Sequence, residues 1–136
     1  MKIVLIHPTI ITMDDSCHII DDGYIAIDND TILAVGEYTD LKPEKYQDYA
    51  IEDCRRDGQP LVALPGFIQT HVHTTQALGR GLADDVDLIT WTRKRIWPYE
   101  AALSADDAYL SAQLSIAAML KSGTTQFCEA GGEHPD

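Results

Sequence analysis

The chain has 136 residues, 45% of them hydrophobic, which suffices for a globular domain and argues against disorder. Its formal net charge of −12 disfavours nucleic acid and anionic membrane surfaces as partners, because both attract basic patches. No apolar run reaches the length of a membrane-spanning helix, and the three cysteines, widely spaced and without a CxxC pair, favour a reducing, cytoplasmic location.

The first part of the chain has the composition of β-structure. Four apolar runs predict strands, at residues 3–7, 9–13, 23–27 and 31–36. The last two flank Asp28-Asn29-Asp30, and this pattern predicts a β-hairpin. The polar segment 38–49 carries Pro43 and predicts a loop or short helix, and residues 51–54 predict another strand.

Two histidines lie two residues apart, at the end of the apolar stretch that begins at Leu61. On a strand, the side chains of His71 and His73 would point to the same face and could bind one divalent metal ion, whereas on a helix they would diverge. For an isolated pair of this kind, a solvent-facing or core position is the commoner outcome. The meaning of the pair therefore depends on the segments that follow it.

Downstream of His73 the apolar spacing becomes helical. Leu88, Ile89, Thr92 and Ile96 predict a helix, which Pro98 is expected to end. Trp91 and Trp97 are expected to be packing residues, with a place in a pocket wall as the less common alternative.

A second helix is predicted over residues 105–121. Ser104 is the expected N-cap, and Gly123 lies just past the expected end. An apolar stripe should pack this helix on a sheet; it comprises Tyr109, Ala112, Ile116 and Leu120. A strand follows at 124–128, so this part of the chain predicts a βαβ unit with a parallel strand pair.

Four segments together resemble the amidohydrolase superfamily, in the branch of 5-methylthioadenosine/S-adenosylhomocysteine deaminases and s-triazine hydrolases. They are PGFIQTHVH at 65–73, LGRGLADD at 78–85, IWPYE at 96–100 and KSGTT at 121–125. The resemblance implies an α/β fold, a metal-dependent (β/α)8 TIM-like barrel preceded by a small β-sandwich. Residues 1–62 would be the N-terminal part of the sandwich domain. Residues 63–136 would be the first βαβ portion of the barrel, in an N-terminal piece of a longer protein.

The same resemblance implies the site residues. His71 and His73 would bind one divalent metal ion, with zinc as the default and iron as the alternative. Glu100 matches a glutamate that binds substrate, in part through ribose hydroxyls, although a glutamate at that point would otherwise be taken as a surface carboxylate. The remaining metal ligands and the catalytic glutamate would lie beyond Asp136, so no catalytic residue other than the metal ligands is expected here.

The implied function is hydrolysis of a carbon–nitrogen bond by deamination of an aromatic heterocycle, methylthioadenosine or S-adenosylhomocysteine. The alternatives are an s-triazine hydrolase or guanine-type deaminase, and a truncated chain without catalysis. The expected partners are a small heterocyclic substrate and, in a homo-oligomer, copies of the same chain. His134 lies in a predicted loop, where it is either solvated or in contact with substrate.

Overall fold

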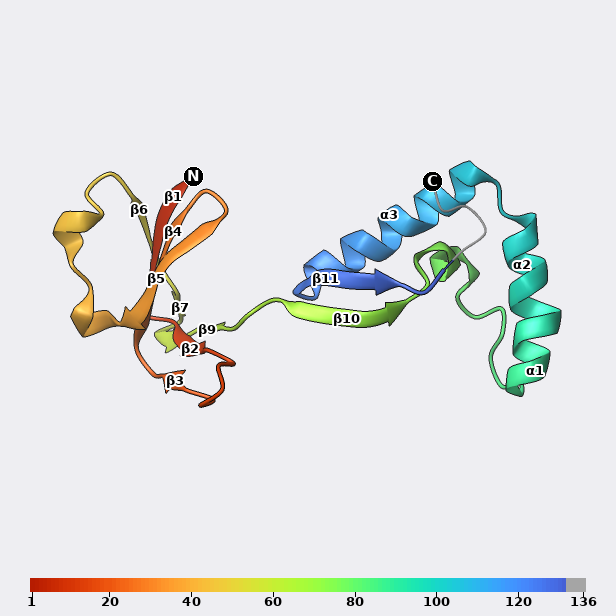
Figure 1. The fold of residues 1–136 in the computed structure, drawn as a ribbon, viewed down its shortest axis with the longest axis horizontal. Coiled ribbons are helices and arrows are strands. Elements are labelled where there is room, and N and C mark those ends of the chain that lie inside the picture. Colours follow the sequence, from red (N-terminus) through yellow and green to blue (C-terminus); the bar gives the residue numbers. More distant parts are fainter. Residues whose placement is uncertain (132–136) are drawn as a thin grey trace. The chain divides into compact units, whose positions relative to one another are not determined.

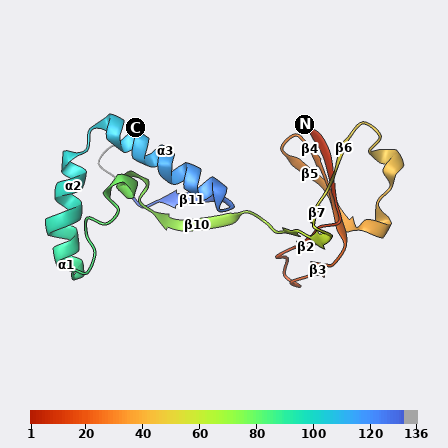
Figure 2. The ribbon, with the colours of Figure 1, turned by 180° about the vertical axis from the view of Figure 1, so that it is seen from behind.

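The computed structural model describes residues 1–131, and the contacts within the chain divide it into two compact units (Figures 1 and 2). The first unit is Met1–Pro65, and the second begins at Gly66. The predicted loop histidine His134 lies outside the described residues. The first unit is built mainly of strands and the second mixes helices and strands, so the described chain is of mixed α/β character.

The main sheet of the first unit has the strand order β5-β4-β1-β6. These strands are β1 Lys2–Ile6, β4 Gly23–Asp28, β5 Thr31–Glu37 and β6 Ala50–Asp53. The predicted hairpin is confirmed, because β4 and β5 pair antiparallel from Gly23 opposite Glu37 to Asp28 opposite Thr31. Asn29 in the turn has a φ of 56°, a left-handed conformation that asparagine tolerates well.

Short strands complete the first unit. They are β2 Thr9–Ile11, β3 Ile19–Ile20 and β9 Val62–Ala63 in one sheet, and β7 Arg55–Arg56 and β8 Gln59–Pro60 in a two-stranded hairpin. The segment 38–49, predicted as a loop or short helix, contains two 3₁₀ helices, η1 Tyr38–Asp40 and η2 Pro43–Lys45. The core contains Val4, Ile10, Ile20 and Ala26. Gly23 is required there, since a Cβ on it would lie 2.3 Å from Cδ1 of Ile10.

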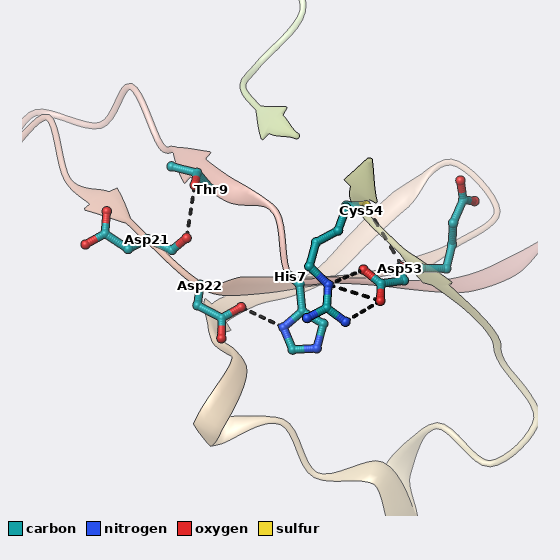
Figure 3. Close-up of polar contacts among 8 residues, drawn as sticks. His7, Thr9, Asp21, Asp22, Asp53 and Cys54 are labelled. Carbon is teal, nitrogen blue, oxygen red and sulfur yellow. Dashed lines mark hydrogen bonds and ion pairs between the residues drawn. The ribbon is translucent and has the colours of Figure 1, made fainter. Parts of the chain in front are cut away.

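A polar cluster joins the end of β1 to neighbouring segments (Figure 3). His7 has a φ of 64°, its Nδ1 lies 2.8 Å from an oxygen of Asp22, and its ring centroid lies 4.0 Å from that of Tyr38. Nearby, the guanidinium of Arg55 donates to Asp53, with a distance of 2.8 Å from Nε to Oδ1. The guanidinium holds the pKa of the Asp53 carboxyl below its ordinary value, chiefly through this hydrogen bonding.

The second unit contains the predicted βαβ arrangement. Strands β10 Phe67–Val72 and β11 Thr124–Glu129 pair in parallel and lie side by side in both views (Figures 1 and 2). The helical segments lie between them in the chain: η3 Thr74–Gly79, α1 Leu88–Trp91, η4 Thr92–Ile96, α2 Trp97–Ala102 and α3 Ala105–Lys121. Because the strands are parallel, both carboxyl ends lie at the same edge of the pair, next to η3.

The expectation that Pro98 ends a helix is wrong. The helical backbone runs on through Pro98 to Ala102, because Thr92–Ile96 forms a π-helical turn and a new α-helix begins at Trp97. Pro98 then lies in the first turn of α2, directly after the π turn. As a result, Glu100 is held on a helix.

Helix α3 begins and ends as predicted, but its packing face differs. Ser104 and Asp107 form a capping box, and Gly123 follows the end with a φ of 87°. The stripe residues Tyr109, Ile116 and Leu120 are exposed. The buried residues are small: Ala108, Ser111 and Ser115. A face of small residues lets the helix approach the turn η3 closely, and the apolar stripe therefore stays uncovered within the described chain.

Candidate active site

The structure brings the two motif histidines together at the carboxyl end of β10. His71 lies within the strand and His73 directly after it, at the N-cap of η3 with extended backbone angles. Their ring centroids are 5.0 Å apart, and the ring planes cross at 85°. The extended backbone thus puts both imidazoles on one side of the strand end, as side chains two residues apart on a strand should be.

Glu129, the last residue of β11, holds the backbone that follows His73. Its Oε2 accepts from the backbone N–H of Thr74 at 2.8 Å and from the Thr74 hydroxyl at 2.5 Å. The backbone N–H of Ala130 donates to the carbonyl of Val72 at 2.9 Å. Together these contacts join the ends of β10 and β11 at the point where the histidines lie.

Two serines of α3 bind the same turn through hydrogen bonds. The hydroxyls of Ser111 and Ser115 both donate to the carbonyl oxygen of Thr74, each at 3.0 Å, and both serines are buried. A buried carbonyl with two donors is well satisfied, and losing either serine would leave it with a single side-chain donor. The position of His73 therefore depends on α3 as well as on its own strand.

Sequence reasoning missed Glu129, Ser111 and Ser115. The available signal was weak: an acidic residue at a strand end, and two serines four residues apart, which lie on one face of a helix. Neither pattern identifies its partner, because Thr74 is 55 residues from Glu129 and 37 from Ser111 in the chain. Only the folded chain shows that all three meet at one residue.

Glu100 lines a cavity of about 360 Å³ next to His73. The other lining residues are Gln76, Trp91, Thr92, Ile96, Trp97 and Gly131. The side-chain amide of Gln76 donates to Oε1 of Glu100 at 2.8 Å, which orients the carboxylate. Both tryptophans line the cavity. Of the two expectations for them, packing residue or part of a pocket wall, the structure shows the pocket wall.

A second cavity, of about 430 Å³, shares Gln76, Trp91 and Ile96 with the first. It is bordered by Tyr99, whose hydroxyl donates to the carbonyl of Thr75 at 3.2 Å. Burial raises the pKa of the Tyr99 phenol, which keeps it a neutral donor. Gly79 also borders this cavity, and a Cβ there would lie 3.0 Å from the Tyr99 ring, which explains the glycine physically.

The two histidine side chains are suited to be two of the ligands of a divalent metal ion. Imidazole nitrogens are good ligands for zinc and iron, and two rings on one side of a strand end can share an ion. Among residues 1–131 there is no group of three or more histidine, cysteine or carboxylate side chains that could hold a metal. The described chain therefore offers two candidate ligands.

No helix in the described part of the chain is both long and apolar enough to cross a membrane. The three cysteines all lie in the described part, and each is a free thiol.

Comparison with known proteins defines the class. The model of the amidohydrolase family matches residues 62–136, more than half of the chain. The chain therefore belongs to the amidohydrolase family.

Individual relatives are enzymes of this kind. A 5-methylthioadenosine/S-adenosylhomocysteine deaminase of Syntrophomonas wolfei is 41% identical over 127 residues, which cover 93% of this chain and 28% of that protein. A protein of the same name from Bacillus cereus is 35% identical over 130 residues, covering 95% of this chain and 28% of the relative. The chain thus spans about 28% of the length of the curated relatives it matches.

Solved structures give the same picture. Guanine deaminase from C. acetobutylicum, with guanine bound in its active site, has a TM-score of 0.77 at 26% identity, over 95% of this chain and 30% of that one. Atrazine chlorohydrolase from Arthrobacter aurescens TC1, complexed with zinc, has a TM-score of 0.74 at 27% identity, over 93% of this chain and 28% of that one. An adenosine deaminase from Xanthomonas campestris with bound zinc has a TM-score of 0.74 at 25% identity, over 95% of this chain and 28% of that one.

Proposed function

We propose that the chain supplies the first metal-binding strand of a (β/α)8-barrel amidohydrolase that follows a small β-sandwich, and that the enzyme deaminates 5-methylthioadenosine or S-adenosylhomocysteine by hydrolysis. The observation that carries the proposal is the convergence of His71 and His73 at the end of β10, beside the cavity that holds Glu100. A cytoplasmic location and a homo-oligomeric state belong to the same proposal.

In this proposal His71 and His73 hold one divalent ion, with zinc as the first choice and iron as the alternative. Zinc is supported by its presence in the solved structures of the adenosine deaminase and the atrazine chlorohydrolase. When bound, such an ion acidifies a water molecule and so makes a hydrolytic nucleophile available near neutral pH. The contribution of this chain is to present two neutral imidazoles from a strand end held by Glu129, Ser111 and Ser115.

Glu100 supports a nucleoside as substrate. One carboxylate oxygen accepts from Gln76, and the carboxylate retains acceptor sites for the two neighbouring hydroxyls of a ribose. Trp91 and Trp97 add flat apolar surface of the kind on which an aromatic ring can pack. Charge-assisted acceptance by Glu100 and ring packing together would select a heterocycle that carries a sugar.

A second candidate is a deaminase or hydrolase of a bare ring, of the guanine or s-triazine type. The similarity to a guanine deaminase with bound guanine and to an atrazine chlorohydrolase favours it. Such rings have no ribose, so this candidate leaves Glu100 without its hydroxyl partners. The nucleoside is preferred because the relatives at 41% and 35% sequence identity are named as nucleoside deaminases.

The test is removal of the metal ligands from the full-length protein that carries this segment. We expect His71→Ala and His73→Ala to purify without stoichiometric metal and to lose deaminase activity by a factor on the order of 10³ or more, because metal assistance supplies several kcal/mol to the transition state. Metal content is measured by elemental analysis and activity with methylthioadenosine.

The control is His18→Ala, which changes an exposed histidine of the first unit. It should keep both metal and activity. A metal-free parent protein, together with normal deamination by His71→Ala, would refute the proposed function.

A further inference from the structure

Glu129 divides its two carboxylate oxygens between two neighbours. Oε2 takes both donors of Thr74, at 2.8 Å and 2.5 Å. Oε1 lies 4.0 Å from Nδ1 of His73. In the parallel strand pair Glu129 lies opposite Val72, the residue before His73, so the carboxylate reaches across the edge of the pair toward the histidine.

The same ring nitrogen of His73 has a second oxygen close by. The carbonyl oxygen of Gly131 lies 3.3 Å from Nδ1, which makes a long hydrogen bond. Gly131 has a φ of 110°, a backbone conformation that L-residues rarely adopt. Both oxygens are acceptors and neither can donate, so a neutral His73 is best accommodated with its proton on Nδ1.

The position of that proton decides which nitrogen can bind a metal. A neutral imidazole has one protonated nitrogen and one with a free lone pair, and only the latter is a metal ligand. Histidine ligands commonly donate their other N–H to a carboxylate or a backbone carbonyl, which sets the ring orientation and raises the basicity of the ligand. Acceptors at Nδ1 therefore leave Nε2 of His73 for the metal.

We propose that Glu129 is a positioning residue for the metal site: with the carbonyl of Gly131 it holds His73 as the Nδ1–H tautomer, and through Thr74 it anchors the turn that aims Nε2. The inference rests on the proposed metal role of His73. It adds to that role a residue from a second strand, 56 positions further along the chain.

The variant Glu129→Gln distinguishes control of the His73 tautomer from anchoring of the turn at Thr74. The glutamine carbonyl can still accept from Thr74, but its NH₂ group would then face Nδ1 of His73 as a donor. A donor at that point favours the tautomer with its proton on Nε2, which cannot bind the metal. Thr74→Val gives the converse change, since it removes the hydroxyl contact and keeps the carboxylate charge beside His73.

The experiment uses the metal-free full-length protein. Side-chain ¹⁵N chemical shifts of His73 should show a protonated Nδ1 in the parent and in Thr74→Val, and a shift toward a protonated Nε2 in Glu129→Gln. Titration with cobalt(II), followed by its absorption spectrum, should give a Kd that is about 10- to 100-fold higher for Glu129→Gln. Glu44→Gln, the same change at an exposed position in η2, should leave both readouts unchanged.

Three results would overturn the inference. One is a protonated Nε2 on His73 in the metal-free parent, a measurement that needs no variant to fold. Another is a cobalt affinity of Glu129→Gln equal to that of the parent. The third is an equal loss of affinity in Thr74→Val and Glu129→Gln with the His73 tautomer unchanged, since this would reduce Glu129 to an anchor of the turn. The same titration separates this inference from the proposed function. If Glu129→Gln binds cobalt normally while His71→Ala does not, the metal site stands without this inference. If both variants bind cobalt normally, the proposed function is refuted as well.

Discussion

Glu100 is placed by two local features at once. The π turn of η4 allows the helix to continue past Pro98, so the glutamate lies on α2, and Gln76 of η3 orients it through a hydrogen bond. A hydrogen bond to a charged group is stronger than one between neutral groups, so an oriented carboxylate is well suited to discriminate hydroxyl-bearing ligands.

At this scale we predict that Glu100→Gln raises KM for methylthioadenosine about 10- to 150-fold with a smaller change in kcat, because hydroxyl contacts to a charged acceptor are worth about 1.5–3 kcal/mol. Any turnover of a bare guanine or s-triazine ring should be unaffected. Steady-state kinetics on the full-length protein measures both. An unchanged KM for the nucleoside would favour the bare-ring candidate, and Glu44→Gln is the matched charge control.

Helix α3 has a well-defined start because Ser104 and Asp107 satisfy each other's backbone groups. The Ser104 hydroxyl accepts from the N–H of Asp107 at 3.2 Å, and the Asp107 carboxylate accepts from the N–H and hydroxyl of Ser104 at 3.1 Å and 2.6 Å. These hydrogen bonds hold the pKa of Asp107 below the ordinary aspartate value, and the one from the Ser104 hydroxyl has the largest effect. The first turn of α3 therefore prefers the ionised carboxylate.

We predict that Ser104→Ala lowers the free energy of unfolding by about 1 kcal/mol at pH 7. Because the folded-state pKa of Asp107 is depressed, its stabilisation is present above the ordinary aspartate pKa of about 3.9 and is lost as the pH falls through the lower folded value. The cost of Ser104→Ala should therefore shrink at pH 3. Urea unfolding at both pH values tests this, and Ser104→Thr, which keeps the hydroxyl, should restore most of the stability. A cost that is equal at both pH values would contradict the linkage.

The packing of α3 shows why helical periodicity alone can mislead. The pattern of Tyr109, Ile116 and Leu120 correctly predicts a helix, but these residues are exposed in the described chain. The helix instead packs through Ser111 and Ser115, whose hydroxyls bind a backbone carbonyl of η3. A hydropathy pattern scores serine as polar and cannot detect that its hydroxyl has a buried partner.

At the scale of the molecule, the described chain combines a β-unit with a single βαβ unit that carries the two candidate metal ligands. Residues 1–131 offer His71 and His73 and no third histidine, cysteine or carboxylate grouped with them. A catalytic zinc site normally has three protein ligands and an open position. Two ligands alone hold a metal weakly.

We therefore predict that the 136-residue chain by itself binds zinc at least on the order of 10²-fold more weakly than the full-length protein, and shows no deamination. Competition with a chelating dye gives the affinity, and an assay with methylthioadenosine gives the activity. His71→Ala in the 136-residue chain should abolish the remaining site-specific binding. Deamination by the 136-residue chain at the rate of the full-length protein would contradict the prediction.

The sequence alone determined the features whose chemistry is local. These are the hairpin around Asn29, the capping box of α3, the stop at Gly123 and the pair His71 and His73 at one strand end. Each depends on residues a few positions apart, so spacing and residue type are enough. The resemblance of the motif segments to one family added the prediction that Glu100 contacts the substrate, and that role stays a prediction.

Only the tertiary structure decided how those features are supported. The partners of Thr74 and His73 lie 37 to 58 residues away in the chain, in α3, in β11 and at Gly131. No local pattern encodes such contacts, because they arise where the parallel pairing of β10 and β11 and the approach of α3 bring distant backbone groups together. The contacts that support the histidine pair are therefore decided by the fold, whereas the pair itself can be read from the sequence.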